Sequence, residues 1–358
     1  MKALFASVVA AALVSMPTQV PAQAPVQPDK MPRVHLITGP GTLPRNPKNR
    51  LEYLRYATTG ESPLTGNELI ERIPEVQKFA RVSVESDKPV PYDSPEQLKS
   101  LSLLIASRLN DPDIAGVVFT HGTNTIEETA YFLNLTVRNE KPVVIVGAQR
   151  PFSTLSSDAP LNLLNAIRVA SDPAARGKGV LVVLNDEINA AREVTKTNTY
   201  RVETFQAREF GLLGYADPDR IVFYRAPTRR HTAQSQFDLT QIAAFPKVDI
   251  LYGYSGDDGD LAKAAVAAGA KGLVIAGTGA GHTQNARKTL KALYDSTGVV
   301  VVRSARVGAG RVIRDDNWQE PGFVAADNLN PQKSRILLQL ALTKTSNPDE
   351  VQRMFDEY

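Results

Sequence analysis

The sequence predicts an α/β protein with two domains, and three observations support this prediction. Short apolar runs rich in β-branched residues alternate along the chain with stretches of helical length and period. Several runs are apolar at every position, as expected for strands of a parallel sheet that helices cover on both faces. An irregular polar segment from Tyr224 to Pro246 interrupts the alternation, which then starts afresh. With 358 residues and 42% hydrophobic content, the chain is long enough for two cores.

The larger, N-terminal domain is expected over residues 25–225. Its predicted strands are 33–37, 80–84, 117–119, 142–146 and 180–184, and its predicted helices are 66–73, one opening at Ser94-Pro95, one after Thr125 and 161–170. Ser94 is a good helix cap and Pro95 suits a first helical position, while Thr125 and Glu128 have the spacing of a capping box. These signals fix where two of the helices begin.

A linker is expected at residues 226–246, followed by a smaller C-terminal α/β domain at 247–358. Its predicted strands are 248–252, 272–276 and 299–303, and its predicted helices are 260–268, 283–296 and 333–342.

The N-terminus has the pattern of a secretory signal peptide. Lys2 precedes an apolar run from Ala3 to Val14, and Ala22-Gln23-Ala24 resembles a signal peptidase site. We therefore expect residues 1–24 to be removed and the protein to be periplasmic or secreted. The run is too short for a permanent anchor, and no later stretch approaches the roughly 20 apolar residues of a membrane span.

Composition narrows the range of chemistry. Lys and Arg exceed Asp and Glu by only 41 to 38, without a dense basic run, so nucleic acid is not an expected partner. The absence of cysteine excludes disulfides and thiol nucleophiles. The four histidines, at positions 35, 121, 231 and 282, lack metal-ligand spacing, so no metal site is expected.

Two predicted strands end in loops of small polar residues. The first is followed by Thr38-Gly39-Pro40-Gly41-Thr42 and the third by Thr120-His121-Gly122-Thr123-Asn124. In α/β sheets, ligands bind at the carboxyl ends of strands, so these hydroxyl and amide groups are candidates for a site. Neither loop has the ending of a phosphate-binding loop or the third glycine of a dinucleotide fingerprint. Threonine and asparagine are also common turn and cap residues, which is the alternative explanation.

Five segments carry a resemblance to a known family. They are Thr120-His121-Gly122-Thr123 with 127–133, Gly147-Ala148-Gln149-Arg150-Pro151, Ser157 to Leu163, Val194-Thr195-Lys196-Thr197-Asn198 and Leu329-Asn330-Pro331-Gln332-Lys333. On these residues the sequence resembles the bacterial exported, type II L-asparaginases and glutaminase-asparaginases, from about Val34 to the C-terminus. The resemblance implies a two-domain fold and hydrolysis of L-asparagine, with L-glutamine as a second substrate. It also implies no cofactor and a homotetramer built as a dimer of dimers with shared active sites.

The resemblance also implies roles for individual residues. Thr42 becomes the nucleophile, assisted by a tyrosine on the loop 44–66, for which we choose Tyr56 over Tyr53. Thr123 and Lys196 form a second cluster, in which the lysine accepts a proton. Burial among hydroxyls can lower a lysine pKa toward neutrality. Without its flanking pattern, Lys196 would be taken for a surface lysine.

Three further residues are implied to bind the substrate. Ser86 would hold the α-carboxylate, and the backbone amides of Gly122 and Thr123 would contribute to substrate or oxyanion binding. An acidic residue from a neighbouring subunit falls near Asp315 or Asp316.

The sequence departs from the family pattern at three positions. The first loop of the family reads Thr-Gly-Gly-Thr, whereas Pro40 is inserted here, which leaves Thr38 as an alternative nucleophile. Asn124 replaces an aspartate that would pair with the substrate ammonium, and Ala280 replaces an asparagine. Two alternative functions follow, an amidase for amides that lack a free α-amino group and a non-catalytic amino-acid-binding relative.

Overall fold

The structure is a computed structural model that describes residues 31–314 and 322–358. The predicted signal peptide and the residues Asp315 and Asp316 lie outside the described residues. The described residues from Pro32 onward belong to one compact unit. No helix among them is long and apolar enough to cross a membrane.

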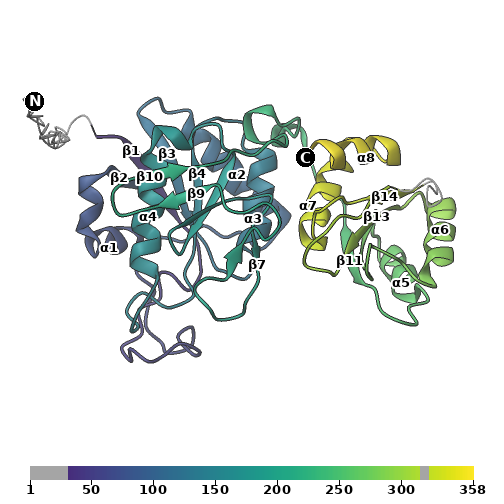
Figure 1. Ribbon diagram of the computed structural model, residues 1–358, viewed down its shortest axis with the longest axis horizontal. Coiled ribbons are helices and arrows are strands. Elements are labelled where there is room, and N and C mark those ends of the chain that lie inside the picture. The colour runs from purple at the N-terminus through teal and green to yellow at the C-terminus, as the bar shows by residue number, and fades with distance from the viewer. Residues whose placement is uncertain (1–30, 315–321) are drawn as a thin grey trace, which may run out of the picture. The chain divides into compact units, whose positions relative to one another are not determined.

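The N-terminal lobe is built on an eight-stranded sheet (Figure 1). In spatial order its strands are β10 (Ile221–Phe223), β9 (Gly214–Ala216), β6 (Glu187–Ala190), β5 (Val180–Leu184), β4 (Val143–Val146), β3 (Ile114–Thr120), β1 (Arg33–Thr38) and β2 (Arg81–Val84). The five strands from β5 to β2 are parallel, and β6, β9 and β10 extend the sheet antiparallel. A separate antiparallel hairpin joins β7 (Thr195–Lys196) to β8 (Phe205–Gln206).

Helices cover both faces of this sheet because its central strands are apolar on both sides. The helices are α1 (Gly66–Glu71), α2 (Pro95–Leu109), α3 (Ile126–Thr136) and α4 (Ala159–Ser171), with short 3-10 turns at Pro74–Lys78 and Pro173–Ala175. Val117 and Phe119 of β3 belong to the core under α2 and α3, whereas the intervening Val118 belongs to the core with α4. Alternate residues of one strand thus enter two different cores.

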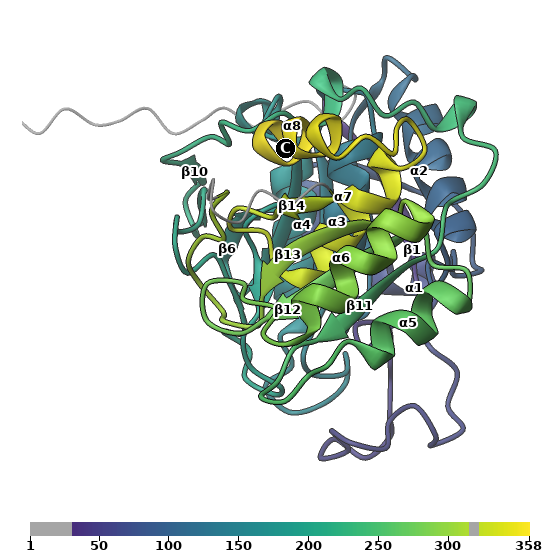
Figure 2. The same cartoon turned by 90° about the vertical axis from the view of Figure 1, so that its right-hand side faces the viewer.

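The C-terminal lobe, which faces the viewer in Figure 2, contains a four-stranded parallel sheet. Its strands, in spatial order, are β11 (Val248–Tyr252), β12 (Gly272–Gly277), β13 (Val300–Ala305) and β14 (Phe323–Ala325), and its helices are α5 (Asp260–Ala267), α6 (Ala286–Thr297), α7 (Pro331–Ala341) and α8 (Pro348–Glu357). Helices α5 and α6 cover one face and α7 packs on the other. Helix α7 also contacts α3, so one apolar core runs from the first lobe into the second.

The two-domain α/β prediction is confirmed. The capping box at Thr125 was wrong, because the Thr125 side chain makes no cap hydrogen bond. A capping box is present instead at α1, where Thr65 and Glu68 satisfy each other's backbone N–H groups. The domain boundaries, including the linker at 226–246, stay a prediction; that segment contains two 3-10 turns, Thr232–Gln234 and Leu239–Gln241.

Several elements were missed, and two of them had readable signals. Strand β6 follows β5 through a turn at Asn185 and Asp186, whose positive φ values of 55° and 62° suit a two-residue hairpin. Helix α8 opens with Asn347-Pro348, where Asn347 caps the helix as Ser94 caps α2. Strands β9, β10 and β14 have only three residues each, too few for a periodic pattern.

Candidate active site

The two polar loops predicted to form the site lie side by side. Strands β1 and β3 are parallel neighbours, with Thr38 opposite Thr120, so both loops leave the same edge of the sheet. Their backbones are in contact, because a Cβ atom at Gly41 would lie 2.7 Å from the Gly122 nitrogen. Any larger residue at position 41 would push the loops apart.

A buried tyrosine, Tyr92, forms hydrogen bonds to both loops. The Tyr92 hydroxyl donates a hydrogen bond to the Pro40 carbonyl and accepts one from the Gly122 N–H at 3.0 Å. The Tyr92 ring also stacks on His121, with the ring centroids 3.6 Å apart. Tyr92 therefore holds the loop that contains Pro40 in place. The Gly122 N–H is bonded to Tyr92 here, and its role toward the substrate stays a prediction.

Thr42 lies at this junction and is paired with the predicted tyrosine. Its residue is 8% exposed, and its hydroxyl lies 2.8 Å from the Tyr56 hydroxyl. The Tyr53 hydroxyl instead donates to the Leu155 carbonyl at 3.1 Å. Of the two tyrosines, the geometry thus brings Tyr56 to Thr42.

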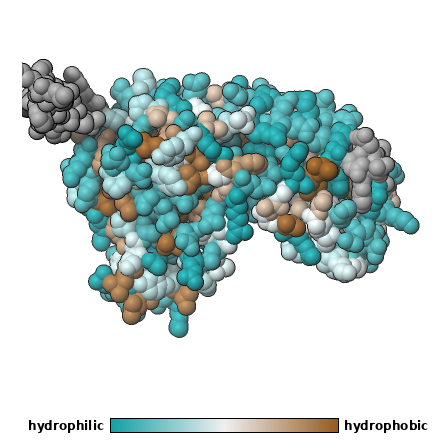
Figure 3. Space-filling model, viewed as in Figure 1, coloured by the Kyte–Doolittle hydropathy of each residue, from teal (hydrophilic) through white to brown (hydrophobic). Residues whose placement is uncertain are grey.

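The loop that carries Tyr56 has no helix or strand between residues 44 and 64 but is tied down at several points. Its backbone accepts hydrogen bonds at Arg45, Pro47 and Arg50 from residues 152, 153 and 155. At its tip the loop exposes Leu51 and Leu54, and Figure 3 shows apolar colour there. The loop therefore closes over Thr42 without being buried itself.

Thr123 is paired with Lys196, as the sequence predicted. Lys196 Nζ donates to Thr123 Oγ1 at 2.9 Å, and Thr123 is 6% exposed. Burial lowers the pKa of Lys196, because water no longer stabilises the ammonium. A lysine with a lowered pKa loses its proton more readily and, in contact with a hydroxyl, can act as a base.

Ser86 follows β2, the strand next to β1. It forms no hydrogen bond with the Thr42–Tyr56 pair or the Thr123–Lys196 pair. Its residue is exposed, and its hydroxyl donates to the Lys88 carbonyl at 3.0 Å. The adjacent Glu85 is held by Arg108 and His35, and the Arg108 guanidinium lowers the pKa of Glu85 to about 2. The residue before Ser86 is thus anchored, the Ser86 hydroxyl is bonded within its own loop, and its role toward the substrate stays a prediction.

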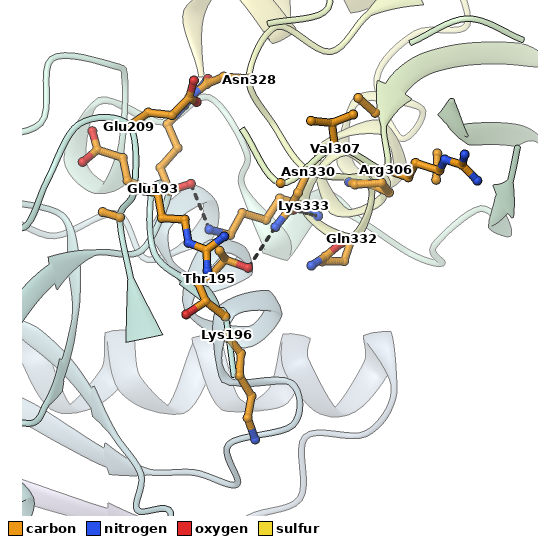
Figure 4. A pocket seen from close by; sticks show the side chains of 18 of the residues that line it. Glu193, Thr195, Lys196, Glu209, Arg306, Val307, Asn328, Asn330, Gln332 and Lys333 are labelled. Atoms are coloured by element: carbon orange, nitrogen blue, oxygen red, sulfur yellow. Dashed lines mark hydrogen bonds between the residues drawn. The ribbon is translucent and has the colours of Figure 1, made fainter. Parts of the chain in front are cut away.

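Asn124 is exposed and lines a cleft of about 710 Å³. The other lining residues are Glu127, Lys196, Thr197, Asn198, Thr199 and Tyr200. A second pocket of about 470 Å³ lies on the other side of β7, between that strand and residues of the C-terminal lobe (Figure 4). Lys196 borders both pockets, whereas Thr42, Tyr56 and Thr123 line neither.

The sequence did not single out three polar residues close to this site. They are Tyr92, Glu127 and Lys333, and all three are buried. The available signal for Glu127 was its place among apolar residues in the sequence of α3. The structure shows that its neighbours, Ile126 and Thr129 to Phe132, are buried. Among the described residues, no group of three or more acidic or histidine side chains could hold a metal ion.

Two family models match the chain. Asparaginase, N-terminal, matches residues 33–229, and the Glutaminase/Asparaginase C-terminal domain matches residues 247–355. Both matches fall on the sequences that form the two lobes.

Individual relatives agree with these models. L-asparaginase 2 of Bacillus subtilis is 44% identical over 333 residues, which span 92% of this chain and 87% of the relative. The glutaminase-asparaginase of Pseudomonas aeruginosa is 37% identical over 99% of this chain and 98% of its own. The crystal structure of a probable cytoplasmic L-asparaginase from Campylobacter jejuni superposes with a TM-score of 0.83 at 40% identity, over 91% of this chain and 100% of the other. With this sequence, this fold and the paired threonines at adjacent strand ends, the chain belongs to the asparaginase family.

Proposed function

We propose that the protein hydrolyses L-asparagine to L-aspartate and ammonia, with L-glutamine as a second substrate. The observation that carries the proposal is a pair of threonine hydroxyls on neighbouring loops, each with a different partner. Thr42 bonds Tyr56 at 2.8 Å, and Thr123 bonds Lys196 at 2.9 Å. One pair suits attack on a carboxamide and the other suits proton transfer.

In the proposed reaction Thr42 Oγ1 attacks the side-chain carbonyl carbon of the substrate. The Tyr56 hydroxyl accepts the Thr42 proton as it gives its own proton to the substrate's amide nitrogen, and backbone N–H groups of the loops stabilise the developing negative charge on oxygen. Protonation of the amide nitrogen then lets ammonia leave, and an aspartyl ester of Thr42 remains. Water hydrolyses this ester, which releases aspartate and restores the threonine.

The Thr123–Lys196 pair supplies the base. A threonine hydroxyl is too weak an acid to ionise unaided, whereas a neutral lysine can accept its proton or that of a water molecule. The lowered pKa of Lys196 favours the neutral amine that this step requires.

Asn124 supports a second candidate function. It lines the cleft next to Lys196 with a neutral amide, so it offers hydrogen bonds but no charge to a substrate ammonium. An amide without a free α-amino group would lose nothing at this position. N-acylated asparagine is therefore the alternative substrate.

The proposal also covers the localisation and the assembly of the protein. Residues 1–24 have the pattern of a signal peptide, which supports a periplasmic or secreted protein, although the Campylobacter jejuni relative is named as cytoplasmic. A homotetramer, with Asp315 of the partner subunit completing each site and Ser86 holding the substrate carboxylate, follows from the family resemblance. Domains at 25–225 and 247–358 are proposed on the same basis.

Ammonia release by the purified mature chain tests these proposals. Asparagine, glutamine and N-acetylasparagine are compared at millimolar concentration, with Thr42→Val and Lys196→Met as variants expected to abolish turnover. Faster release from N-acetylasparagine than from asparagine would select the alternative substrate. Thermal stabilisation by aspartate without any release would instead identify a binding relative and overturn the enzymatic proposal.

A further inference from the structure

The strand that carries Lys196 is too short to hold itself in place. In the part of the chain that the structure describes, β7 pairs only with the two residues of β8, outside the eight-stranded sheet. An isolated two-stranded hairpin is marginally stable in water. The position of Lys196 therefore depends on side chains that bind β7 from other elements.

Glu127 provides the first of these contacts. It lies in the first turn of α3, the helix that begins just after Thr123, and its residue is 6% exposed. Its Oε1 accepts hydrogen bonds from the Thr195 hydroxyl at 3.0 Å and from the Lys196 backbone N–H at 3.3 Å. One carboxylate thus joins the element next to Thr123 to the strand that carries Lys196.

Two residues of the C-terminal lobe complete the arrangement. Asn330, which caps α7, donates from Nδ2 to Glu127 Oε2 at 2.9 Å. Lys333, 2% exposed, lies behind β7 with its Nζ 4.0 Å from the same carboxylate oxygen. Figure 4 shows Asn330 and Lys333 together on one side of β7, with the Lys196 side chain directed away from them.

Lys333 uses two of its three ammonium donors on backbone carbonyls, and the Glu127 carboxylate lies 4.0 Å away. Besides Glu127, its Nζ reaches the carbonyls of Arg192 at 2.9 Å and Val194 at 2.5 Å, directly before β7 in the chain. Burial lowers the pKa of Lys333 to about 8, and the nearby Glu127 carboxylate opposes that shift. A fully buried lysine that binds backbone oxygens fixes the course of the chain it binds, because leaving those oxygens unpaired would be unfavourable.

We propose that Glu127, Asn330 and Lys333 are positioning residues through which the C-terminal lobe keeps Lys196 within hydrogen-bonding distance of Thr123. The inference rests on the proposed function, in which Lys196 is the base. None of the three is hydrogen-bonded to the Lys196 amine or the Thr123 hydroxyl. Their hydrogen bonds reach β7 at the Thr195 hydroxyl, at the Lys196 backbone N–H and at the carbonyls just before the strand. A shift of roughly 1 Å in a catalytic group can reduce a rate about a hundredfold.

The first test compares kcat and KM in the full mature chain for three variants and a control. Lys333→Met keeps the length of the side chain without its donors. Asn330→Ser keeps an oxygen that can cap α7 but has no amide group to bind Glu127. Glu127→Gln removes the negative charge of the carboxylate that contacts both β7 and α7. The control, Asn347→Ser, alters the cap of α8 in the same lobe, away from β7.

The three variants should lower kcat by about 10-fold to 100-fold while KM changes by less than about threefold. The control should keep both values within about twofold and its melting temperature close to that of the wild type, because serine caps a helix about as well as asparagine. A variant with normal kcat but a lower melting temperature would show a purely structural role. That result in all the variants that fold would overturn the proposal.

A second measurement does not depend on turnover. An amine-reactive reagent labels lysines at a series of pH values, and mass spectrometry locates Lys196 and gives its apparent pKa. If the positioning is correct, this pKa rises by at least about half a unit in the three variants and stays unchanged in the control, because β7 moves toward water. An unchanged pKa in every folded variant would overturn the proposal. If the wild type releases no ammonia but the variants still show this pKa rise, the proposed function is refuted and the positioning is supported.

Discussion

The Nζ atom of Lys196 lies 2.9 Å from the hydroxyl oxygen of Thr123, although 73 positions separate the two residues in the chain. The contact joins the loop after β3 to the hairpin β7–β8. It is the most specific point at which the structure supports acid–base chemistry, and it determines how activity should depend on pH.

The value of kcat should rise with pH as Lys196 loses its proton, and then level off. Because burial lowers the pKa of Lys196, the rise should be complete below the usual range of a lysine. Lys196→Arg keeps the positive charge at all accessible pH values and should lower kcat by roughly 10²-fold to 10⁴-fold. A pH–rate profile of both proteins checks this; a profile of Lys196→Arg that matches the wild type would contradict the assignment.

Tyr56→Phe should lower kcat by about tenfold to a hundredfold, because it removes only the hydroxyl that bonds Thr42. Tyr53→Phe is the matched control, since it removes a hydroxyl from the same loop that bonds the Leu155 carbonyl instead. Steady-state kinetics of the two variants therefore identify the catalytic tyrosine. A larger loss in Tyr53→Phe would reverse the choice made from the sequence.

Asn124→Asp should raise kcat/KM for free asparagine relative to N-acetylasparagine by about tenfold or more. The new carboxylate would lie in the cleft beside Lys196, where a substrate ammonium can pair with it. Asn198→Asp, a change of the same kind on the lining of the same cleft, is the control for added charge alone. An equal gain in both variants would show that the effect is not local to position 124.

The folded protein should lose stability as the pH falls from about 6.5 to about 4.5, partly because of His121. Burial lowers the pKa of His121 to about 3, whereas an unfolded histidine titrates near 6.5. Between these values the unfolded chain binds a proton that the folded chain does not, so acid favours unfolding by roughly 1.4 kcal/mol per pH unit. The stabilisation is present above about pH 6.5 and is lost toward pH 3.

Thermal unfolding of His121→Gln as a function of pH measures this contribution. The variant should be less stable near pH 7, because His121 bonds the Gly122 carbonyl and the Thr129 hydroxyl, yet its stability should fall less steeply with acid. His231 is also buried with a lowered pKa, so it adds to the wild-type slope and should remain in the variant. If stability falls equally steeply with acid in both proteins, groups other than His121 cause the acid sensitivity.

Much of the fold was readable from local sequence, because the central strands are apolar throughout and end in small-residue loops. The antiparallel extension β6–β9–β10 was not, since its strands are short and their pairing depends on contacts distant in the chain. In the site, Lys196 was predicted from its flanking motif and Thr42 from the family resemblance of the first loop, and the structure places each beside its expected partner. Glu127 and Lys333 lie in segments that carry the family resemblance but were given no role, because the sequence does not show that they are close in space. Only the packing of α3 on α7 shows that they meet.

The contact of Glu127 with Asn330 and Lys333 limits how freely the two lobes can be recombined. A chimera of the N-terminal lobe of this protein with another C-terminal lobe keeps this contact only if the second lobe supplies an amide and an ammonium at the positions of Asn330 and Lys333. Each lobe thus matches its own family model, but the contact that supports β7 needs residues from both lobes. Recombination between lobes should therefore treat Glu127, Asn330 and Lys333 as one set.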